Sequence, residues 1–339
     1  MIDKPASVAA ADFNGDGQRD IVVTNFDGNN IGVFINAGAG TLLAAVSYPV
    51  GTNPSSIAVG DVNNDGQCDI IVANYGSSTV NVLINNNNGI FSNQVTYLVG
   101  SNPYCVVTAD VTGDNRLDII VAGFGSATVN ILFNGGDGTF PKQVAVEVTN
   151  KPVSLVMLDW NNDDMLDILV SSYDANEVNV FFNQGGGTFS IRNTFPVPIQ
   201  NQPRAIAVAD VNNDGIVNLI VANYMSNTID VYFTTPSGAQ YPTTYTVGTN
   251  PYSLAVVDVN NDNATDIIVA NYDSSSISVR LNTGSGMFIP ENTYMVSGKP
   301  RSVRVADVNK DSKLDIIIAS DSSPNNVGIL LHRSNILIN

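Results

Sequence analysis

The sequence predicts an all-β protein, a seven-bladed β-propeller with four-stranded antiparallel blades. Three series of residues recur in phase along its 339 positions. The acidic pattern D-x-N-x-D-x-x-x-D begins at Asp12, Asp61, Asp110, Asp159, Asp210, Asp258 and Asp307. A proline stands seven residues before each copy, at Pro5, Pro54, Pro103, Pro152, Pro203, Pro251 and Pro300. An aromatic residue follows in six units, at Phe26, Tyr75, Phe124, Tyr173, Tyr224 and Tyr272, and Asp321 takes that place in the seventh.

Each unit of about 49 residues has room for four strands and contains no helical apolar stripe. In the second unit, strand-length segments lie at residues 55–59, 69–73, 79–84 and 94–99. The apolar run at residues 70–72 is continuous and predicts a strand that is buried on both faces. An isolated four-stranded sheet cannot bury both of its faces, so the units must pack radially around an axis. We therefore expect one domain over residues 1–339, with a blade starting near each proline.

The ends of the chain leave the closure of this ring open. The first strand follows Pro5 in blade one, and residues 336–338 can supply only a short outer strand for blade seven. No segment is left over as an obvious interlocking strand between the first and last blades.

The acidic pattern predicts a calcium site in each unit. Positions one, three, five and nine offer side-chain oxygens, and position seven offers its backbone carbonyl, a donor set that suits Ca²⁺. We therefore expect up to seven calcium ions, one per blade. The candidate ligands are Asp12, Asn14, Asp16, Gln18 and Asp20; Asp61, Asn63, Asp65, Gln67 and Asp69; Asp110, Thr112, Asp114, Arg116 and Asp118; Asp159, Asn161, Asp163, Met165 and Asp167; Asp210, Asn212, Asp214, Ile216 and Asn218; Asp258, Asn260, Asp262, Ala264 and Asp266; Asp307, Asn309, Asp311, Lys313 and Asp315.

The loops differ from an EF-hand and from one another. Position twelve is valine or isoleucine, so the acid at position nine must take the role of the EF-hand glutamate. Position six, where we expect a positive φ, is glycine in three loops and Asn115, Asp164, Asn263 or Ser312 in the others. Asn218 lowers the ligand charge in the fifth loop, which we expect to bind most weakly. The alternatives are ion-free Asx turns, or ions that serve the fold alone.

The segments D-V-N-N-D-G-Q-C-D-I-I-V-A-N-Y at residues 61–75 and D-V-N-N-D-G-I-V-N-L-I-V-A-N-Y at residues 210–224 resemble FG-GAP or VCBS-type repeats. Such repeats build the calcium-bearing propeller of integrin α-chain heads and of a mushroom lectin. The resemblance extends over essentially the whole chain. It implies that the calcium loops lie on the lower face of the ring. Ligands would then be met on the upper face, by the loops between second and third strands and between successive blades.

Two groups of residues are candidate ligand-binding sites on that upper face. Sugar-binding chemistry is offered by the repeated amide and ring pairs Asn74 and Tyr75, Asn223 and Tyr224, and Asn271 and Tyr272. The alternative is that each ring packs against the next blade while the asparagine caps a turn. The positions after the prolines include Tyr104, Arg204, Tyr252 and Arg301, which predict a site for an anion or acidic sugar at the channel mouth. The alternative there is charge balance, for example between Arg301 or Arg304 and Asp321.

Composition narrows the function. With 14 Lys and Arg against 31 Asp and Glu, the net charge of −17 argues against a nucleic-acid partner, and no stretch is apolar enough for membrane insertion. Cys68 and Cys105 are expected to be free thiols.

We expect a monomeric, calcium-binding recognition or adhesion module that binds carbohydrate or protein. We place it outside the cell or at its surface, although residues 1–4 do not begin a signal peptide.

Catalysis has less support in the sequence. His332 has no partners for a serine triad, and we expect it in an outer strand of blade seven. A polysaccharide lyase using Tyr104 or Tyr252 as base, with Arg204 or Arg301 neutralising a uronate, is the alternative. A scaffold within a longer protein, with no ligand of its own, is a further one.

Overall fold

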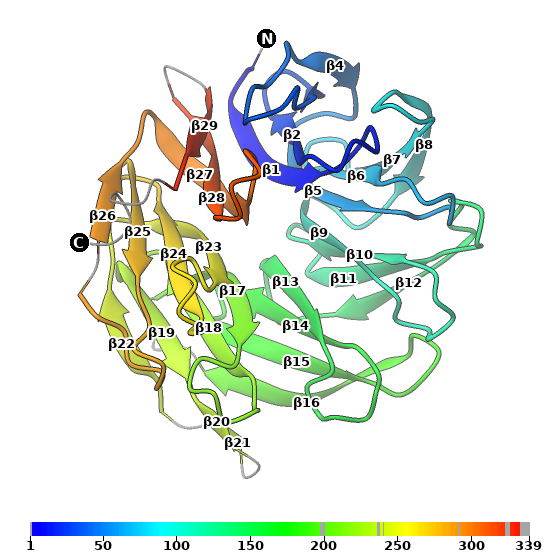
Figure 1. The fold of residues 1–339 in the computed structure, drawn as a ribbon. Helices are drawn as coiled ribbons and strands as arrows, with labels where there is room; N and C mark the ends of the chain where they lie inside the picture. The colour runs from blue at the N-terminus through cyan, green and yellow to red at the C-terminus, as the bar shows by residue number, and fades with distance from the viewer. Residues whose placement is uncertain are drawn as a thin grey trace.

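Seven sheets stand around a central axis in the computed structural model (Figure 1). The structure describes residues 2–196, 201–235, 238–239, 241–290, 292–322 and 326–332, and every regular element in these ranges is a β-strand. Six sheets have four strands and the seventh has three described strands, all antiparallel and in chain order from the axis outwards. The predicted seven-bladed propeller is confirmed.

The strands form four concentric layers. The innermost are β1 (Pro5–Ala11), β5 (Pro54–Gly60), β9 (Pro103–Ala109), β13 (Pro152–Leu158), β17 (Pro203–Ala209), β23 (Pro251–Val257) and β27 (Lys299–Ala306). The second strands are β2 (Asp20–Asn25), β6 (Asp69–Asn74), β10 (Asp118–Gly123), β14 (Asp167–Ser172), β18 (Asn218–Asn223), β24 (Asp266–Asn271) and β28 (Asp315–Asp321). The third strands are β3 (Asn30–Phe34), β7 (Thr79–Asn85), β11 (Thr128–Phe133), β15 (Glu177–Asn183), β19 (Thr228–Tyr232), β25 (Ser276–Arg280) and β29 (Asn326–Leu330). The outer strands are β4 (Val46–Pro49), β8 (Phe91–Leu98), β12 (Lys142–Glu147), β16 (Phe189–Pro196), β22 (Thr243–Thr246) and β26 (Asn292–Met295). Blade five also has a small hairpin of β20 (Thr234–Thr235) and β21 (Gly238–Ala239).

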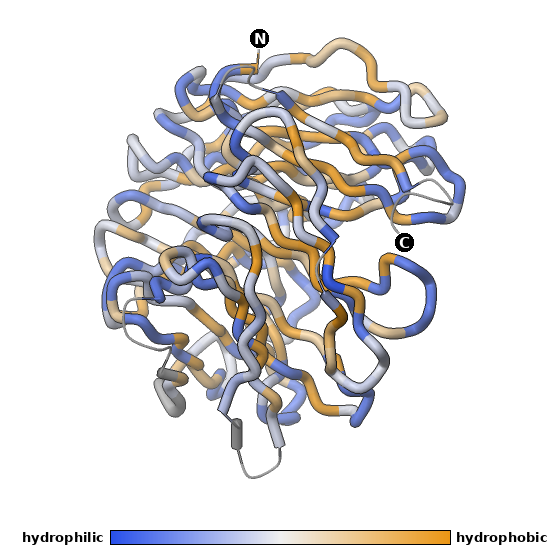
Figure 2. The backbone as a smooth tube through the Cα atoms, turned by 90° about the vertical axis from the view of Figure 1, so that its left-hand side faces the viewer, coloured by the Kyte–Doolittle hydropathy of each residue, from blue (hydrophilic) through white to orange (hydrophobic). Residues whose placement is uncertain are grey.

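The hydrophobic core is divided into clusters that lie between adjacent blades. Every residue of the second strands is buried, as the continuous apolar runs predict. Each of the seven clusters joins residues of two neighbouring blades. Figure 2 shows the result from the side, with apolar stretches along the strands and hydrophilic residues in many of the connecting loops. Burying both faces of every sheet is therefore what holds the ring together.

The ring closes by the same contacts that join its other blades. Val8 and Ile21 of blade one pack with Ile317 of blade seven in one buried cluster. The Val8 amide also donates to Ser302 Oγ at 3.4 Å. Blade one takes all four strands from its own unit, so no strand is exchanged across this joint in the described chain. The predicted short outer strand at residues 336–338 lies outside the described residues.

The inner strands place two sets of loops at opposite ends of the channel. Each acidic loop connects a first strand to a second strand at the lower end. At the upper end, the turn after the second strand meets the segment before the proline, as where the Phe26 amide donates to the Lys4 carbonyl at 3.1 Å. The acidic loops and the aromatic turns thus lie on opposite faces, as the resemblance implies.

Candidate functional site

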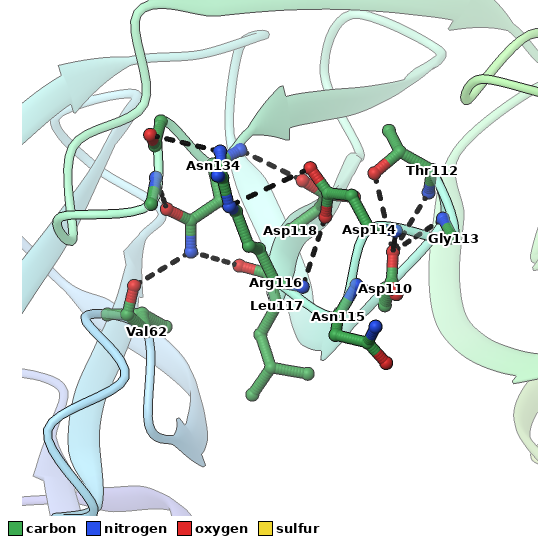
Figure 3. A network of polar contacts seen from close by, with 12 residues as sticks. Val62, Asp110, Thr112, Gly113, Asp114, Asn115, Arg116, Leu117, Asp118 and Asn134 are labelled. Atoms are coloured by element: carbon green, nitrogen blue, oxygen red, sulfur yellow. Dashed lines mark hydrogen bonds and ion pairs between the residues drawn. The ribbon is translucent and has the colours of Figure 1, made fainter.

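The acidic loop of blade three shows how position one organises the turn (Figure 3). Asp110 Oδ1 accepts hydrogen bonds from the backbone amides of Thr112, Gly113 and Asp114, at 2.7 to 3.2 Å. Asp110 Oδ2 accepts from the Asn115 amide at 2.6 Å. Burial raises the pKa of Asp110, but these backbone hydrogen bonds outweigh it and hold the pKa below its usual value. The Asp110 carboxylate is therefore ionised and fixed by the turn.

Position nine plays a different part from position one. Asp118 is buried, and its two oxygens accept from the backbone amides of Val111 at 3.1 Å and Asn134 at 2.9 Å. The Asn134 side chain donates to the carbonyls of Leu117 and of Val62 in the preceding blade, both at 2.8 Å. Position nine thus connects the acidic loop to a hydrogen bond between blades (Figure 3).

This asparagine bridge recurs around the ring. The bridging residues, sixteen positions after the ninth-position acid, are Asn36, Asn85, Asn134, Asn183 and Asn282. Thr234 stands at this position in blade five, where its hydroxyl donates to the Val217 carbonyl of its own blade. In blade seven the equivalent residue is His332, whose amide donates to Asp315 at 2.8 Å. The expectation of His332 in an outer strand was wrong, because it follows β29, the third strand of its blade.

The carboxylates of one loop act on each other's ionisation. Burial, together with the nearby charges of Asp65 and Asp61, raises the pKa of Asp69 to about 6. Burial together with the other two carboxylates of its loop likewise raises the pKa of Asp266 to about 6. Backbone hydrogen bonds oppose the shift in both cases. Like charges are therefore held close together at the ends of the second strands.

The donor set of these loops fits a hard divalent cation in its chemistry. Oxygen is the only donor type, and positions one, three and five lie in one exposed turn, where Asn14 Nδ2 donates to Asp16 Oδ2 at 3.0 Å. The backbone at position six has a positive φ in all seven loops, as predicted. In the described residues, no three His, Cys, Asp or Glu side chains are gathered in an arrangement for a metal ion. The ninth-position acid also accepts hydrogen bonds from two backbone amides, as Asp118 does.

Blade five departs from this pattern at Asn218. Its Oδ1 accepts from the Val211 amide at 3.0 Å, while its buried Nδ2 has no acceptor. An amide offers one accepting oxygen where the aspartates of other blades use two. The fifth loop is therefore the least complete of the seven in hydrogen bonding as well as in charge.

A cavity of about 180 Å³ occupies the axial channel. The seven residues that follow the in-phase prolines all line it, namely Ala6, Ser55, Tyr104, Val153, Arg204, Tyr252 and Arg301. The next position along each inner strand contributes Ser7, Ser56, Cys105, Ser154, Ala205, Ser253 and Ser302. Each serine oxygen accepts from a backbone amide of a neighbouring blade, as Ser7 does from Ile57 at 3.3 Å. A layer of hydroxyl groups therefore surrounds the cavity.

Two tyrosines meet across the channel. Tyr104 of blade three and Tyr252 of blade six have their hydroxyl oxygens 2.5 Å apart. Arg204 donates to the Tyr104 hydroxyl. Its guanidinium carbon also lies 4.0 Å from the ring centre of Tyr252 and 4.8 Å from that of Tyr104. Tyr173 and Tyr224 complete the surroundings of this guanidinium. Tyr104, Arg204, Tyr252 and Arg301, the predicted residues of the channel mouth, all line this one cavity.

The charges of this group shift the ionisation of Tyr252. Burial raises the pKa of Tyr252, but the positive charges of Arg204 and Arg301 outweigh it and leave that pKa below its usual value. Burial raises the pKa of Tyr104 well above its usual value. The two hydroxyls thus behave as a pair in which Tyr252 loses its proton first.

Most upper-face cations are paired with aspartates of the neighbouring turns. Arg301 Nε lies 2.5 Å from Asp321 Oδ2, the pairing that charge balance predicts. Lys4 pairs with Asp27 at 3.1 Å and Lys299 with Asp273 at 2.6 Å. Lys151 pairs with Asp174 in the same way. Charge balance therefore accounts for these four residues.

The predicted amide and ring pairs are only partly available to a ligand. Asn74, Asn223 and Asn271 are fully buried. Their side-chain amides bond within their own blades, as Asn74 does with Asn81 at 2.8 Å. The expectation that these amides face a ligand is therefore corrected, because the strand ends need them. The rings remain half-buried and form chains of contacts along the upper face, as between Tyr75 and Phe124 at 6.2 Å.

Sequence reasoning missed the bridging asparagines and the serine layer. Both were visible as residues in phase with the repeat, sixteen positions after the ninth-position acid and two after the proline.

Cys68 and Cys105 are free, as predicted.

The model of the FG-GAP-like repeat matches residues 12–72, 61–121, 110–170, 159–221, 210–269 and 258–318. No curated protein matches the sequence. No helix in the described ranges is long and apolar enough to cross a membrane.

Several solved structures share the fold. A structure of BBS1N in complex with ARL6DN has a TM-score of 0.71 and 14% identity, covering 98% of this chain and 94% of that one. An Agrocybe aegerita lectin that recognises non-reducing terminal N-acetylglucosamine has a TM-score of 0.58 and 21% identity, with coverages of 86% and 80%. A putative 6-phosphogluconolactonase from Bacteroides fragilis has a TM-score of 0.69 and 16% identity, with coverages of 89% and 87%. At these identities the similarity concerns the fold alone.

Proposed function

Since this chain belongs to the family of FG-GAP-like repeat proteins, we propose that it is a calcium-stabilised recognition domain that binds a carbohydrate or protein partner outside the cell. The partner binds the upper face, opposite the acidic loops. The observation that supports this most directly is the series of half-buried aromatic rings around the mouth of the axial cavity.

The calcium ions stabilise the fold in this proposal. In loop three, Asp110, Thr112, Asp114, Asp118 and the Arg116 carbonyl would hold the ion, which supplies positive charge that the loop lacks. Support comes from the mutual effect of the carboxylates on their pKa values and from the all-oxygen donor set. Loops of this kind in extracellular modules bind calcium at about 10⁻⁴ to 10⁻³ M, which favours an extracellular location.

A carbohydrate is favoured over a protein as the partner. Sugars present apolar faces that pack on aromatic rings, and Tyr75, Tyr224 and Tyr272 are half-buried on this face. The fold neighbours include a carbohydrate-binding lectin and a propeller in complex with a protein, so the scaffold is compatible with both classes of partner. Since Asn74, Asn223 and Asn271 are buried, the aromatic rings would supply the contacts.

A glycan array tests this proposal. We expect binding to the calcium-loaded protein that is lost with EDTA. Replacing both Tyr75 and Tyr224 with leucine, which keeps apolar volume, should weaken binding by about tenfold or more. Tyr241→Ala is the matched control, because this tyrosine is 98% exposed and belongs to no ring contact described above. Equal binding by the double variant and the control would overturn the assignment of the rings.

A lyase is the second candidate, favoured by one observation. Tyr252 has a lowered pKa next to Arg204 and Arg301, as a phenolate base facing a uronate would require. Incubation with uronate polymers should then release unsaturated sugars, and Tyr252→Phe should abolish that release. Binding without any such product supports the recognition domain instead.

A further inference from the structure

The axial cavity contains more positive charge than its surroundings balance. Arg301 is neutralised by Asp321. No carboxylate pairs with Arg204 or Arg304 among the described residues. The buried Nε of Arg204 also has no hydrogen-bond partner. A guanidinium removed from bulk water without a counter-ion is costly, and its contacts with tyrosine rings offset only part of that cost.

The repeats provide an internal control for Arg304. The fourth residue after each in-phase proline is Ala9, Ala58, Val107, Val156, Ala207, Ala255 or Arg304. Strand register makes these positions equivalent, because each pairs with an apolar residue of its own second strand, as Arg304 does with Ile317. Six blades therefore form the inner strand with a small apolar residue, and the fold itself does not require an arginine here.

Arg304 points into the channel and not into the packed core. It lines the cavity, and its side chain is exposed although the inner strands surround it. Its one hydrogen bond goes to the adjacent Val303 carbonyl at 2.8 Å, which leaves most of its five donors available. The same comparison across blades applies to Arg204, whose equivalents include Ala6, Ser55 and Val153.

We propose that the axial cavity binds a small oxyanion, contacted by Arg204 and Arg304 and by the serine hydroxyls of the inner strands. Two unbalanced guanidinium groups and a layer of O–H donors form a donor-rich site that matches the acceptor oxygens of a carboxylate or phosphate. The volume of about 180 Å³ leaves room for a phosphate or a small organic acid. This site lies within the axial channel, whereas the proposed partner contacts the aromatic rings of the upper face.

Isothermal titration calorimetry on the whole chain, at constant ionic strength, tests this inference. Inorganic phosphate is titrated in one arm and sodium gluconate in the other. Arg304→Ala gives blade seven the residue found in four other blades, so the variant should fold, and Arg204→Val likewise copies Val153. We expect each substitution to weaken binding by about tenfold or more. Lys142→Ala removes the same charge from exposed β12 and should leave binding unchanged.

The two arms identify the kind of oxyanion. Binding of phosphate alone assigns a tetrahedral anion, and binding of gluconate alone assigns an organic carboxylate; either supports the site. Equal affinities of wild type and Arg304→Ala, or no heat from either anion at millimolar concentration, would overturn it. Glycan binding at the upper face is measured separately, so failure of one assignment leaves the other standing.

Discussion

Asp118 and Asn134 form a link between an acidic loop and the neighbouring blade. Asp118 Oδ1 accepts from the Asn134 amide at 2.9 Å, and the Asn134 side chain donates to the Val62 carbonyl of the preceding blade at 2.8 Å. The same arrangement recurs at Asp20 and Asn36 across the joint that closes the ring. The ends of the acidic loops are therefore part of the contact between blades.

Removing this bridge should destabilise the protein. Asn134→Ala leaves the Val62 and Leu117 carbonyls without their donor, at a cost of about 1 to 3 kcal/mol for each group that stays buried. We expect a loss of about 2 to 5 kcal/mol in the free energy of unfolding, measured by urea denaturation. Gln94→Ala on exposed β8 is the control and should change little. A loss below about 1 kcal/mol would contradict this prediction, because it would mean that water replaces the asparagine as donor to these carbonyls at little cost.

Calcium removal should lower the melting temperature. At a tenfold excess over its Kd, each bound ion stabilises the fold by about 1.4 kcal/mol, so several sites together have a large effect. Differential scanning calorimetry with calcium, with magnesium and with EDTA measures it. Magnesium should substitute poorly, since it requires tighter octahedral geometry. An unchanged melting temperature in EDTA would remove calcium from the account.

Restoring the acid at position nine of blade five should strengthen calcium binding by that blade. Asn218→Asp gives the position a second accepting oxygen and a further negative charge next to Asp210 and Asp214. We expect tighter calcium binding by the weakest site, by about tenfold, in a calcium titration. The substitution should stabilise the protein only when calcium is present, because the charge of the buried carboxylate is otherwise unbalanced. Asp214→Asn is the opposite control and should weaken the same site.

The tyrosine pair should give the protein an early phenolate. The pKa of Tyr252 lies below its usual value because Arg204 and Arg301 outweigh the effect of burial. An ultraviolet titration should show one tyrosine ionising before the others, and Tyr252→Phe should remove this step. The lowered folded-state pKa contributes stability above the unfolded value of about 10 and loses it as pH falls through the folded value. At neutral pH the shift therefore adds nothing to stability.

The repeat made the architecture and the loop conformations predictable. Seven prolines in phase mark the starts of the inner strands to within one residue, and the position-six φ angles follow from one turn type. The roles of single side chains were harder to predict. The sequence places Asn74 in a loop, but β6 extends through Asn74, so this side chain is buried. The sequence offers Arg304 as one of two possible partners for Asp321, and only the lining of the cavity shows that it faces the channel.

The joint between blades one and seven has the smallest buried apolar cluster of the seven, counted over the described residues. No covalent connection or shared strand reinforces it there. If the ring opens transiently, we expect it to open first at this joint, and the amides that face the joint should exchange their hydrogens fastest. A partner that contacts both blades would stabilise the closed ring, and its affinity would be reduced by the cost of suppressing that motion.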